Sequence, residues 1–427
     1  MTIHDFISAI NEGQLDDTLA RLYGADRQTL LAQHIRYLSA AENFSKLYPD
    51  CNDIQVFSAS GRTEIGGNHT DHQHGCVLAA AVSLDMIAIV SFNEDGIIRF
   101  SSAECPECIV DITDLSVNEA EKGTTEALIR GIAAGFAGDG IITEGFNVYA
   151  DSAVPVGSGL SSSAAFEVLI GTMIGSRYNN SETSAVEIAQ IGQYAENVYF
   201  GKASGLMDQL VSAVGGFSFI DFESPDEPVI ESAGFDFLRS GYCICITNTG
   251  SSHADLSDDY SAISSEMIHV ANELGCDVLR EANEEVFYEK LPELRKTCSD
   301  RELLRAFHFF AENERAALEA QALRNGDTEE FFELVNASGA SSAQLLQNLY
   351  SPKSPLSQPI PLALAVSRRF LGGSGAVRVH GGGFAGTIQA FVPVYTAKDY
   401  IREMERIFGA GCCSMLNIRP CGGIRIC

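Results

Sequence analysis

The segment Pro155-Val-Gly-Ser-Gly-Leu-Ser-Ser-Ser-Ala-Ala165 joins a strand-like pattern to a helix-like one. Phe146 to Ala150 alternates as a strand does, and from about Ser161 the apolar residues recur at helical spacing. Gly157 and Gly159 let the backbone bend tightly while its amide groups stay exposed. Because the positive end of the following helix points at this loop, the segment predicts an anion site suited to nucleotide phosphates.

The loop differs from the two best-known nucleotide motifs. No GxxxxGK[ST] run occurs in the chain, which excludes a Walker A loop. Ser162 stands where a dinucleotide fingerprint has its third glycine. A flexible turn whose serines cap a helix is the structural alternative for this segment.

Elsewhere in the chain, strand and helix signals alternate irregularly, which favours an α+β fold over a doubly wound sheet. Residues 77–92 and 96–100 are predicted to be strands joined by a hairpin turn at 93–96. The other expected elements are helices over 16–48, 185–200 and 258–348 and strands over 217–222, 242–247, 376–379 and 387–392. Acidic residues of the helices between 258 and 348 are interpreted as solvated faces. A polar, proline-bearing break at 223–228 predicts two domains, 1–222 and 223–427.

The charge of the chain and its apolar segments argue against several classes of protein. The 427 residues include 28 Lys and Arg against 57 Asp and Glu, a formal net charge of −29. Such a surface repels phosphate backbones and anionic lipids, which argues against nucleic-acid or membrane partners. The start of the chain lacks a signal-peptide pattern, and no stretch of about 20 apolar residues can span a bilayer. The 12 cysteines follow no disulfide-scaffold spacing, so a cytoplasmic protein with free thiols is expected.

Two more segments combine glycines with polar side chains. Gly61-Arg-Thr-Glu-Ile-Gly-Gly-Asn-His-Thr-Asp-His-Gln-His-Gly75 lies between two apolar strands, and Val379-His-Gly-Gly-Gly-Phe-Ala-Gly-Thr387 is a second glycine-rich loop. With the segment 155–165, these resemble the three motifs of the GHMP kinases. The first is similar to the galactokinase signature, in which Gly-Arg opens the motif and His-Thr-Asp follows. The resemblance extends to Gly205-Leu-Met-Asp-Gln209, Asn248-Thr249, His253 and Tyr260.

The resemblance implies a two-domain GHMP kinase fold. An N-terminal domain of mixed sheet and helices and a C-terminal ferredoxin-like α+β domain would enclose the active site in the cleft between them. The implied reaction is ATP-dependent phosphorylation of the anomeric hydroxyl of galactose, giving galactose 1-phosphate, with ATP and Mg²⁺ as cofactors. A monomer or weak homo-oligomer is expected.

The resemblance also assigns the catalytic roles. Asp208 would accept the proton of the anomeric hydroxyl, and Arg62 would stabilise charge on the reacting phosphate and keep Asp208 ionised. Ser163 and Glu196 would bind Mg²⁺, which prefers oxygen ligands. The phosphate cradle would comprise Gly157, Ser158, Gly159, Leu160, Ser161, Ser162 and Ser163. The structural alternatives are a helix-start carboxylate for Asp208, an arginine tied to backbone carbonyls for Arg62 and a solvated helix residue for Glu196.

Sugar recognition carries over by the same resemblance. Asp71 would bind the 3- and 4-hydroxyls, His69 the same end of the ring, the backbone of Gly205 the 2-hydroxyl, and Tyr260 the region of the 4-hydroxyl. Packing in the lead-in to a helix is the alternative for His253 and Tyr260. Asn68 occupies the position at which galactokinases usually carry a glutamate for the 6-hydroxyl.

Departures from the family pattern keep other functions open. The neutral Asn68 and the sequence Ser261-Ala-Ile263, where arginines are usual, leave the substrate less certain than the reaction. The alternatives are a 1-kinase for an N-acetylhexosamine or a C6-altered hexose, and a non-catalytic regulator that binds sugar and ATP. A transition-metal site at His69, Asp71, His72 and His74 is a further, weaker interpretation.

Overall fold

The computed structural model describes residues 1–103, 107–155, 159–180, 182–202, 204–235, 237–250 and 256–427. The helices are α1 (Ile3–Asn11), α2 (Asp16–Tyr23), α3 (Arg27–Leu47), α4 (Thr125–Gly138), α5 (Ser162–Tyr178), α6 (Ala185–Tyr194), α7 (Met207–Val214), α8 (Ser257–Leu274), α9 (Glu284–Glu289), α10 (Leu291–Leu294), α11 (Asp300–Asn325), α12 (Thr328–Ser341), α13 (Pro359–Leu371) and α14 (Ala397–Phe408). The strands are β1 (Gln55–Gly66), β2 (Cys76–Phe92), β3 (Ile97–Ser102), β4 (Cys108–Asp111), β5 (Phe146–Ser152), β6 (Phe217–Asp221), β7 (Val229–Ser232), β8 (Tyr242–Asn248), β9 (Ala376–Val379), β10 (Thr387–Pro393), β11 (Cys413–Leu416) and β12 (Ile424–Arg425). Short 3-10 or π turns are η1 (Asp71–Gln73), η2 (Glu119–Glu121), η3 (Ala195–Phe200), η4 (Phe237–Ser240), η5 (Leu279–Glu281), η6 (Ser342–Leu346) and η7 (Val394–Thr396).

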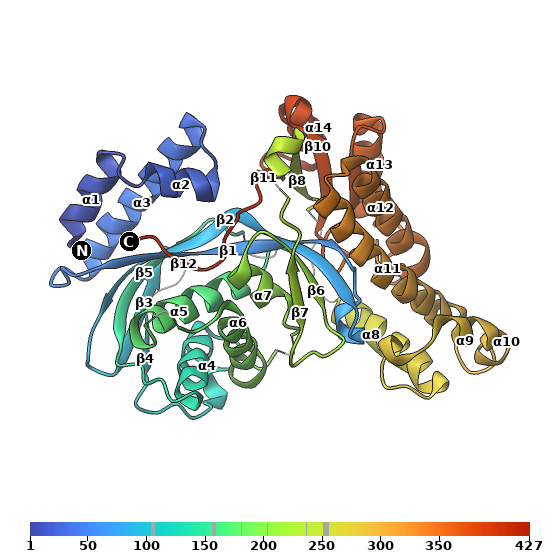
Figure 1. Cartoon of the computed structure of the whole chain (residues 1–427), viewed down its shortest axis with the longest axis horizontal. Coiled ribbons are helices and arrows are strands. Elements are labelled where there is room, and N and C mark those ends of the chain that lie inside the picture. The colour runs from blue at the N-terminus through green and yellow to red at the C-terminus, as the bar shows by residue number, and fades with distance from the viewer. Residues whose placement is uncertain (104–106, 156–158, 181, 203, 236, 251–255) are drawn as a thin grey trace.

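The long antiparallel ladder of β1 and β2 forms the centre of the first sheet (Figure 1). The strand order is β12-β1-β2-β5-β3-β4, and β6 pairs with β2 and β7 with β6. Its strands pair antiparallel except β3 and β5, which run parallel. The register of β1 against β2 shifts between Ser60 and Arg62, as a β-bulge does. This bulge lies at the start of the galactokinase-like signature.

The predicted β2–β3 hairpin is wrong, because β5 lies between these two strands. The backbone amides of the turn bond to the segment before β5: Asn93 donates to Gly145 (N···O 3.1 Å) and Gly96 to Glu144 (N···O 2.7 Å). The turn has the right local chemistry for a hairpin. The strand pairing is instead decided by burial of β5, whose apolar side chains fill the centre of the sheet.

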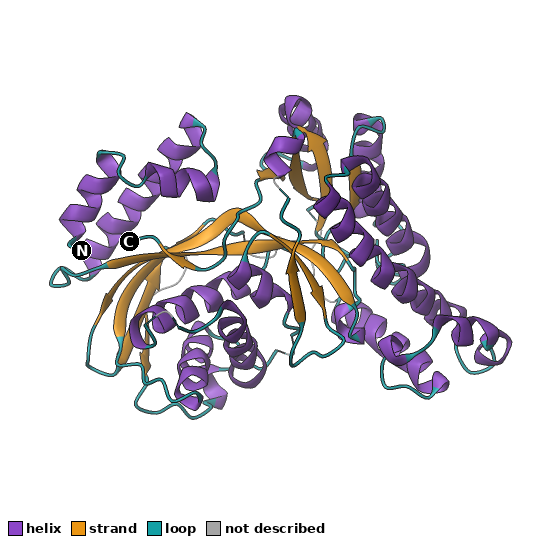
Figure 2. Ribbon diagram, viewed as in Figure 1, coloured by secondary structure: helices purple, strands orange, loops and turns teal. Residues whose placement is uncertain are grey.

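Helices cover both faces of this sheet (Figure 2). Helices α4 to α7 pack on one face, where Phe57, Ala59 and Val90 belong to their core. On the other face, α1 to α3 pack against Val56 and Ile89, near the chain's two ends. Further along the ladder, that face is covered by the C-terminal half of the chain. The β1–β2 ladder therefore runs beneath both halves of the molecule.

The second sheet is antiparallel, with the order β11-β8-β10-β9. Helices α8 to α13 connect β8 to β9, and α14 connects β10 to β11, which is the strand order and connectivity of a ferredoxin-like domain. The expected α+β class and fold are thus confirmed. The last strand, β12, returns to β1 of the first sheet, with Phe57 opposite Arg425. The boundary at 222 and 223 stays a prediction.

The expectation that the acidic residues between 258 and 348 lie on solvated helix faces is wrong for helix α11. Glu312 and Glu319 on this helix are completely buried, because α11 packs at once against α8, α12 and the β1–β2 ladder. Arg315 and Glu312 form an ion pair within the helix. Both oxygens of Glu319 lack a hydrogen-bond partner among the described residues, and burial raises the pKa of Glu319 well above its ordinary value of 4.5.

Two further expectations concern cysteines and membranes. Every cysteine that the structure describes is free. No helix within the described ranges is both long and apolar enough to cross a bilayer.

Candidate active site

The bulge in β1 places Arg62 beside the glycine and serine loop. A Cβ atom at Gly61 would lie 2.9 Å from the carbonyl oxygen of Leu160, so glycine is needed for this approach. The amide of Arg62 donates to that same oxygen (N···O 3.0 Å), and its guanidinium donates to the oxygen of Gly159. The signature and the phosphate loop are thus fastened to each other.

Arg62 and Asp208 form a two-pronged ion pair. Nε and Nη2 of Arg62 each lie 2.6 Å from one carboxylate oxygen of Asp208, which is in the first turn of α7. The side chain of Arg62 is 11% exposed and that of Asp208 is 30% exposed, so the carboxylate remains accessible. Burial raises the pKa of Asp208, but Arg62 and the hydroxyl of Ser161 lower it below 3.8 overall. Asp208 is therefore ionised at neutral pH.

The described part of the phosphate loop begins at Gly159; Gly157 and Ser158 lie outside the described residues. Gly159 has φ +76°, and a Cβ atom there would lie 3.1 Å from Nδ1 of His380. Leu160 is buried, Ser161 has φ +56°, and Ser162 and Ser163 begin α5. The N-terminus of α5 thus opens beside the Arg62–Asp208 pair, where an anion is favoured.

Glu196 is buried in the π-helical turn η3, so the interpretation of Glu196 as a solvated residue is wrong. Its carboxylate accepts from Lys202 Nζ (2.7 Å) and from Gln209 Nε2 (3.0 Å). Gln209 also donates to Glu167 (2.9 Å), whose other oxygen is buried without a partner among the described residues. Burial and the nearby Glu196 raise the pKa of Glu167 well above 4.5. Ser163 and Glu196 offer oxygen donors, which are the ligands that Mg²⁺ prefers, and Mg²⁺ would take the place of the Lys202 ammonium at Glu196.

The predicted sugar residues converge next to this pair. A Cβ atom at Gly205 would lie 3.0 Å from Oδ2 of Asp71, so these two residues face each other. Burial raises the pKa of Asp71 above its ordinary value, and the nearby His69 offsets part of this rise. The His69 Nε2 lies 3.0 Å from the oxygen of Gly382, and the hydroxyl of Tyr260 donates to Gly383 (2.8 Å). The third glycine loop therefore adjoins the sugar residues. His253 lies outside the described residues.

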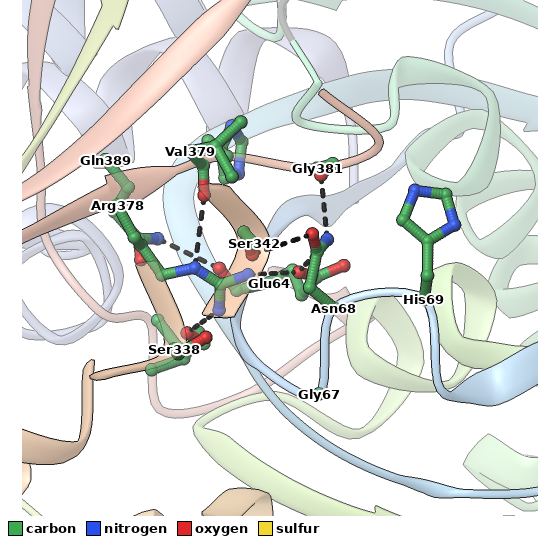
Figure 3. A network of polar contacts seen from close by, with 12 residues as sticks. Glu64, Gly67, Asn68, His69, Ser338, Ser342, Arg378, Val379, Gly381 and Gln389 are labelled. Atoms are coloured by element: carbon green, nitrogen blue, oxygen red, sulfur yellow. Dashed lines mark hydrogen bonds and ion pairs between the residues drawn. The ribbon is translucent and has the colours of Figure 1, made fainter. Parts of the chain in front are cut away.

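Asn68 is placed differently from the sequence-based expectation of a contact with the sugar's 6-hydroxyl. It is completely buried between β1, η6 and the third glycine loop, and protein atoms hydrogen-bond its side chain (Figure 3). Asn68 is held there by polar side chains that the sequence did not indicate. Those that bond to it are Glu64, Ser342 and Asn348, and Arg378 pairs with Glu64. Arg378 inside the otherwise apolar strand β9 was the available signal.

The histidines of the signature show no metal-binding geometry. Among the described residues, no three His, Cys, Asp or Glu side chains gather to hold an ion. The rings of His69 and His72 lie 5.7 Å apart, and burial lowers the pKa of His72 to about 3. His72 is therefore a neutral, partly buried ring in the same motif as His69 and Asp71.

Comparisons with known proteins show which families the chain is similar to. The family model of the GHMP kinases N terminal domain matches residues 124–216, and that of the galactokinase galactose-binding signature matches residues 42–92. The chain is 30% identical to the galactokinase of Homo sapiens over 362 residues, which are 82% of this chain and 87% of that protein. It is 29% identical to the galactokinase of Lactobacillus helveticus over 358 residues, 83% of this chain and 89% of the relative.

Solved structures are similar in fold. The crystal structure of Lactococcus lactis galactokinase complexed with galactose matches with a TM-score of 0.76 at 23% identity, covering 91% of this chain and 99% of that one. The mevalonate kinase of Methanococcus jannaschii matches with a TM-score of 0.61 at 15% identity, covering 86% and 98%. At these identities the likeness concerns the fold.

Proposed function

The chain belongs to the galactokinase family of the GHMP kinases and is an ATP-dependent sugar kinase, and we propose that it converts galactose and ATP into galactose 1-phosphate and ADP. The observation that carries this proposal is the Arg62–Asp208 pair, which lies between the phosphate loop and Asp71. A positioned carboxylate beside an arginine and a phosphate loop supplies the base, the charge stabilisation and the phosphate site that phosphoryl transfer to a hydroxyl uses.

Asp208 acts as the base in this proposal. The anomeric oxygen forms a bond to the γ-phosphorus, the bond from that phosphorus to the bridging oxygen of ADP breaks, and the hydroxyl proton passes to Asp208. Because Arg62 keeps the pKa of Asp208 low, the carboxylate is a weak base. It takes the proton late, when bonding to phosphorus has made the hydroxyl acidic, which suits a loose transition state.

The residues of the phosphate loop bind and orient ATP. We assign the phosphates to the loop of residues 157–163 and the N-terminus of α5, where backbone amides and the helix dipole favour anions. Ser163 and Glu196 would hold Mg²⁺, whose charge offsets that of the phosphates in a protein of net charge −29. Lys202, which pairs with Glu196, would give way to the metal.

The sugar lies, in this proposal, between Asp71, Gly205 and Asp208. Asp71 faces Gly205, and the two carboxylates are close enough for Asp208 to raise the pKa of Asp71. We assign the 3- and 4-hydroxyls to Asp71, the 2-hydroxyl to the backbone of Gly205, and the C4 side of the ring to His69 and Tyr260. Since Asn68 is committed to protein contacts, it gives no support to a sugar altered at C6.

An ADP-release assay across hexoses and N-acetylhexosamines tests the proposal. Galactose should stimulate ADP release most, and phosphorus NMR should show a sugar 1-phosphate as the product. A clear preference for an N-acetylhexosamine would replace galactose as the substrate. Binding of sugar and ATP without ADP release would instead identify a non-catalytic regulator.

A further inference from the structure

Asn68 uses its whole hydrogen-bonding capacity inside the protein. Its Nδ2 donates to Oε1 of Glu64 and to the oxygen of Gly381, both at 2.9 Å. Its Oδ1 accepts from Nδ2 of Asn348 (2.8 Å) and from the hydroxyl of Ser342 (3.3 Å). An amide side chain has two donor hydrogens and two acceptor lone pairs. All four are engaged, as Figure 3 shows for the contacts with Glu64, Gly381 and Ser342.

The main chain of Asn68 is also fixed. Its amide donates to Oε1 of Glu312 (3.4 Å), and its carbonyl oxygen lies 2.9 Å from Nε2 of His308. Burial lowers the pKa of His308 to about 4, so the ring is neutral and donates this hydrogen bond. Residue 68 is therefore held by α11 from one side and by the third glycine loop from the other.

The three glycine carbonyls of that loop are held by side chains from different elements. Gly381 accepts from Asn68, Gly382 from Asn348 (3.1 Å) and Gly383 from Tyr260. The His69 ring also meets Gly382. Through its bonds to Glu64 and Gly381, Asn68 thus links β1 to the glycine loop, and His69 adds a second contact from the same segment.

The carboxylates next to Asn68 each have an arginine partner, so the neutral Asn68 is not needed to balance their charge. Glu64 pairs with Arg378 Nη2 (2.8 Å), and both side chains are buried, with Arg378 also donating to the oxygen of Val379 (3.1 Å). Glu312 pairs with Arg315. A carboxylate at position 68 would be the unbalanced charge, placed beside Glu64 and facing the carbonyl oxygen of Gly381. Burying an uncompensated charge in this way is strongly unfavourable.

From these contacts we infer that Asn68 is a positioning residue that fastens the Gly381–Gly383 loop to β1, and that the buried Glu64 requires a neutral amide at position 68. The inference rests on the proposed function for its kinetic consequences, but its charge relation between residues 64 and 68 is independent of it. The departure from the family's glutamate is then compensated inside the protein, and residue 68 does not read the 6-hydroxyl.

A double-mutant cycle of Asn68→Asp and Glu64→Gln tests the charge relation. Asn68→Asp keeps the size but puts two carboxylates in contact, so the melting temperature should fall by about 5 °C or more. Glu64→Gln alone leaves Arg378 unpaired and should also lower it. In the double variant the contact between residues 64 and 68 holds a single carboxylate, to which the new amide at position 64 can donate, so the double should melt higher than Asn68→Asp. Asn43→Asp, on α3, is the control and should combine additively with Glu64→Gln.

Steady-state kinetics of the same variants show whether Asn68 positions the sugar site or only stabilises the fold. In Asn68→Asp, KM for galactose should rise about tenfold, the equivalent of one displaced hydrogen bond, and the double variant should recover much of this loss. The ratio of kcat/KM for galactose to that for 6-deoxygalactose should be the same in the wild type and the double variant.

Additive melting temperatures for Asn68→Asp and Glu64→Gln would overturn the inference, whatever the activity. A tenfold change in the 6-deoxygalactose ratio in the folded double variant would do so as well, because residue 68 would then face C6. If the wild type phosphorylates no hexose while the cycle shows rescue, the proposed function fails and the charge relation stands.

Discussion

Two buried clusters of arginine and aspartate along the β1–β2 ladder have the same chemistry but different surroundings. Asp208 has one arginine partner and keeps 30% of its side chain exposed. Asp85, on β2 beneath the N-terminal helices, is 0% exposed and binds two arginines, Arg36 (Nη1···Oδ1 2.6 Å) and Arg419 (Nη1···Oδ2 3.0 Å). Tyr23 and Ser58 donate to it as well.

The comparison separates an aspartate that is enclosed by the protein from one that is accessible, as the base proposed here must be. Every oxygen of Asp85 is enclosed by donors, so no substrate atom can reach it, and its ion pairs join α3, β2 and the C-terminal segment. Asp208 is enclosed by Arg62 on one side and open on the other, between the phosphate loop and Asp71. The exposure of the Asp208 carboxylate, more than its pairing with arginine, therefore distinguishes it from Asp85 and supports its proposed role as the base.

The largest expected effect is the loss of turnover in Asp208→Asn. The amide keeps the size of the side chain but cannot accept the hydroxyl proton, so kcat should fall by about 10²- to 10⁴-fold. Binding of galactose and ATP, measured by calorimetry, should persist, and the melting temperature should fall less than in Asp85→Asn, because Asp208 is partly exposed. Turnover like that of the wild type would remove Asp208 from the role of base.

Asp85→Asn should have the opposite profile. Removing this charge leaves Arg419 buried without its carboxylate partner, so unfolding should become easier by about 3–5 kcal/mol. The measurement is urea unfolding, with kcat determined per folded molecule. A variant that unfolds like the wild type but has lost turnover would show that the two clusters are not separable in this way.

The motifs predicted which segments would lie together. Arg62 and Asp71 come from one motif and Gly205 and Asp208 from another, and the structure brings the two motifs together. The catalytic and sugar-binding roles of these residues stay predictions. The strand and helix positions were largely predicted from their periodicity. The pairing of β3 was not, because a turn motif reports local geometry whereas β5 enters the sheet through long-range burial.

The sequence does not reveal which charged and polar side chains are buried. Glu312 and Glu319 lie on an acidic, amphipathic helix, and nothing in that pattern shows that α11 is enclosed on several sides. Asn68 was interpreted from its neighbours in the motif, whereas its partners Asn348 and Gly381 come from about 300 residues away. Such contacts depend on tertiary packing, which a single sequence does not specify.

A smaller effect is expected at the phosphate side of the Arg62–Asp208 pair. Gly159→Ala adds a Cβ atom 3.1 Å from His380 in a backbone with φ +76°, so KM for ATP should rise about tenfold, the equivalent of roughly 1.4 kcal/mol. Gly326→Ala is the matched control: Gly326 has φ +72° and no neighbouring atom within 4 Å. The control should lose similar stability but keep its KM for ATP. Equal KM values for ATP in both variants would place the phosphates elsewhere.

The smallest expected effect is on acid stability. Burial raises the pKa of Asp85, but Arg36 and Arg419 lower it below 3.8 overall. A folded-state pKa below the unfolded one means that the unfolded chain binds more protons as the pH falls, so this contribution is present above about pH 4 and is lost below it. The slope from one proton is at most about 1.4 kcal/mol per pH unit. The difference in unfolding free energy between the wild type and Asp85→Asn should therefore be constant above about pH 4 and shrink as the pH falls below it.

The same titration in Asp208→Asn sharpens the comparison between the two clusters. The pKa of Asp208 is also lowered, with one arginine as its partner rather than two, but its carboxylate is partly in water. The difference in unfolding free energy between the wild type and Asp208→Asn should therefore change less with pH than that for Asp85→Asn. Urea unfolding at each pH gives the three curves. Curves for wild type and Asp85→Asn that stay parallel down to pH 3 would mean that the arginines around Asp85 do not hold it ionised. The division between a stabilising and a reacting aspartate would then have to rest on exposure alone.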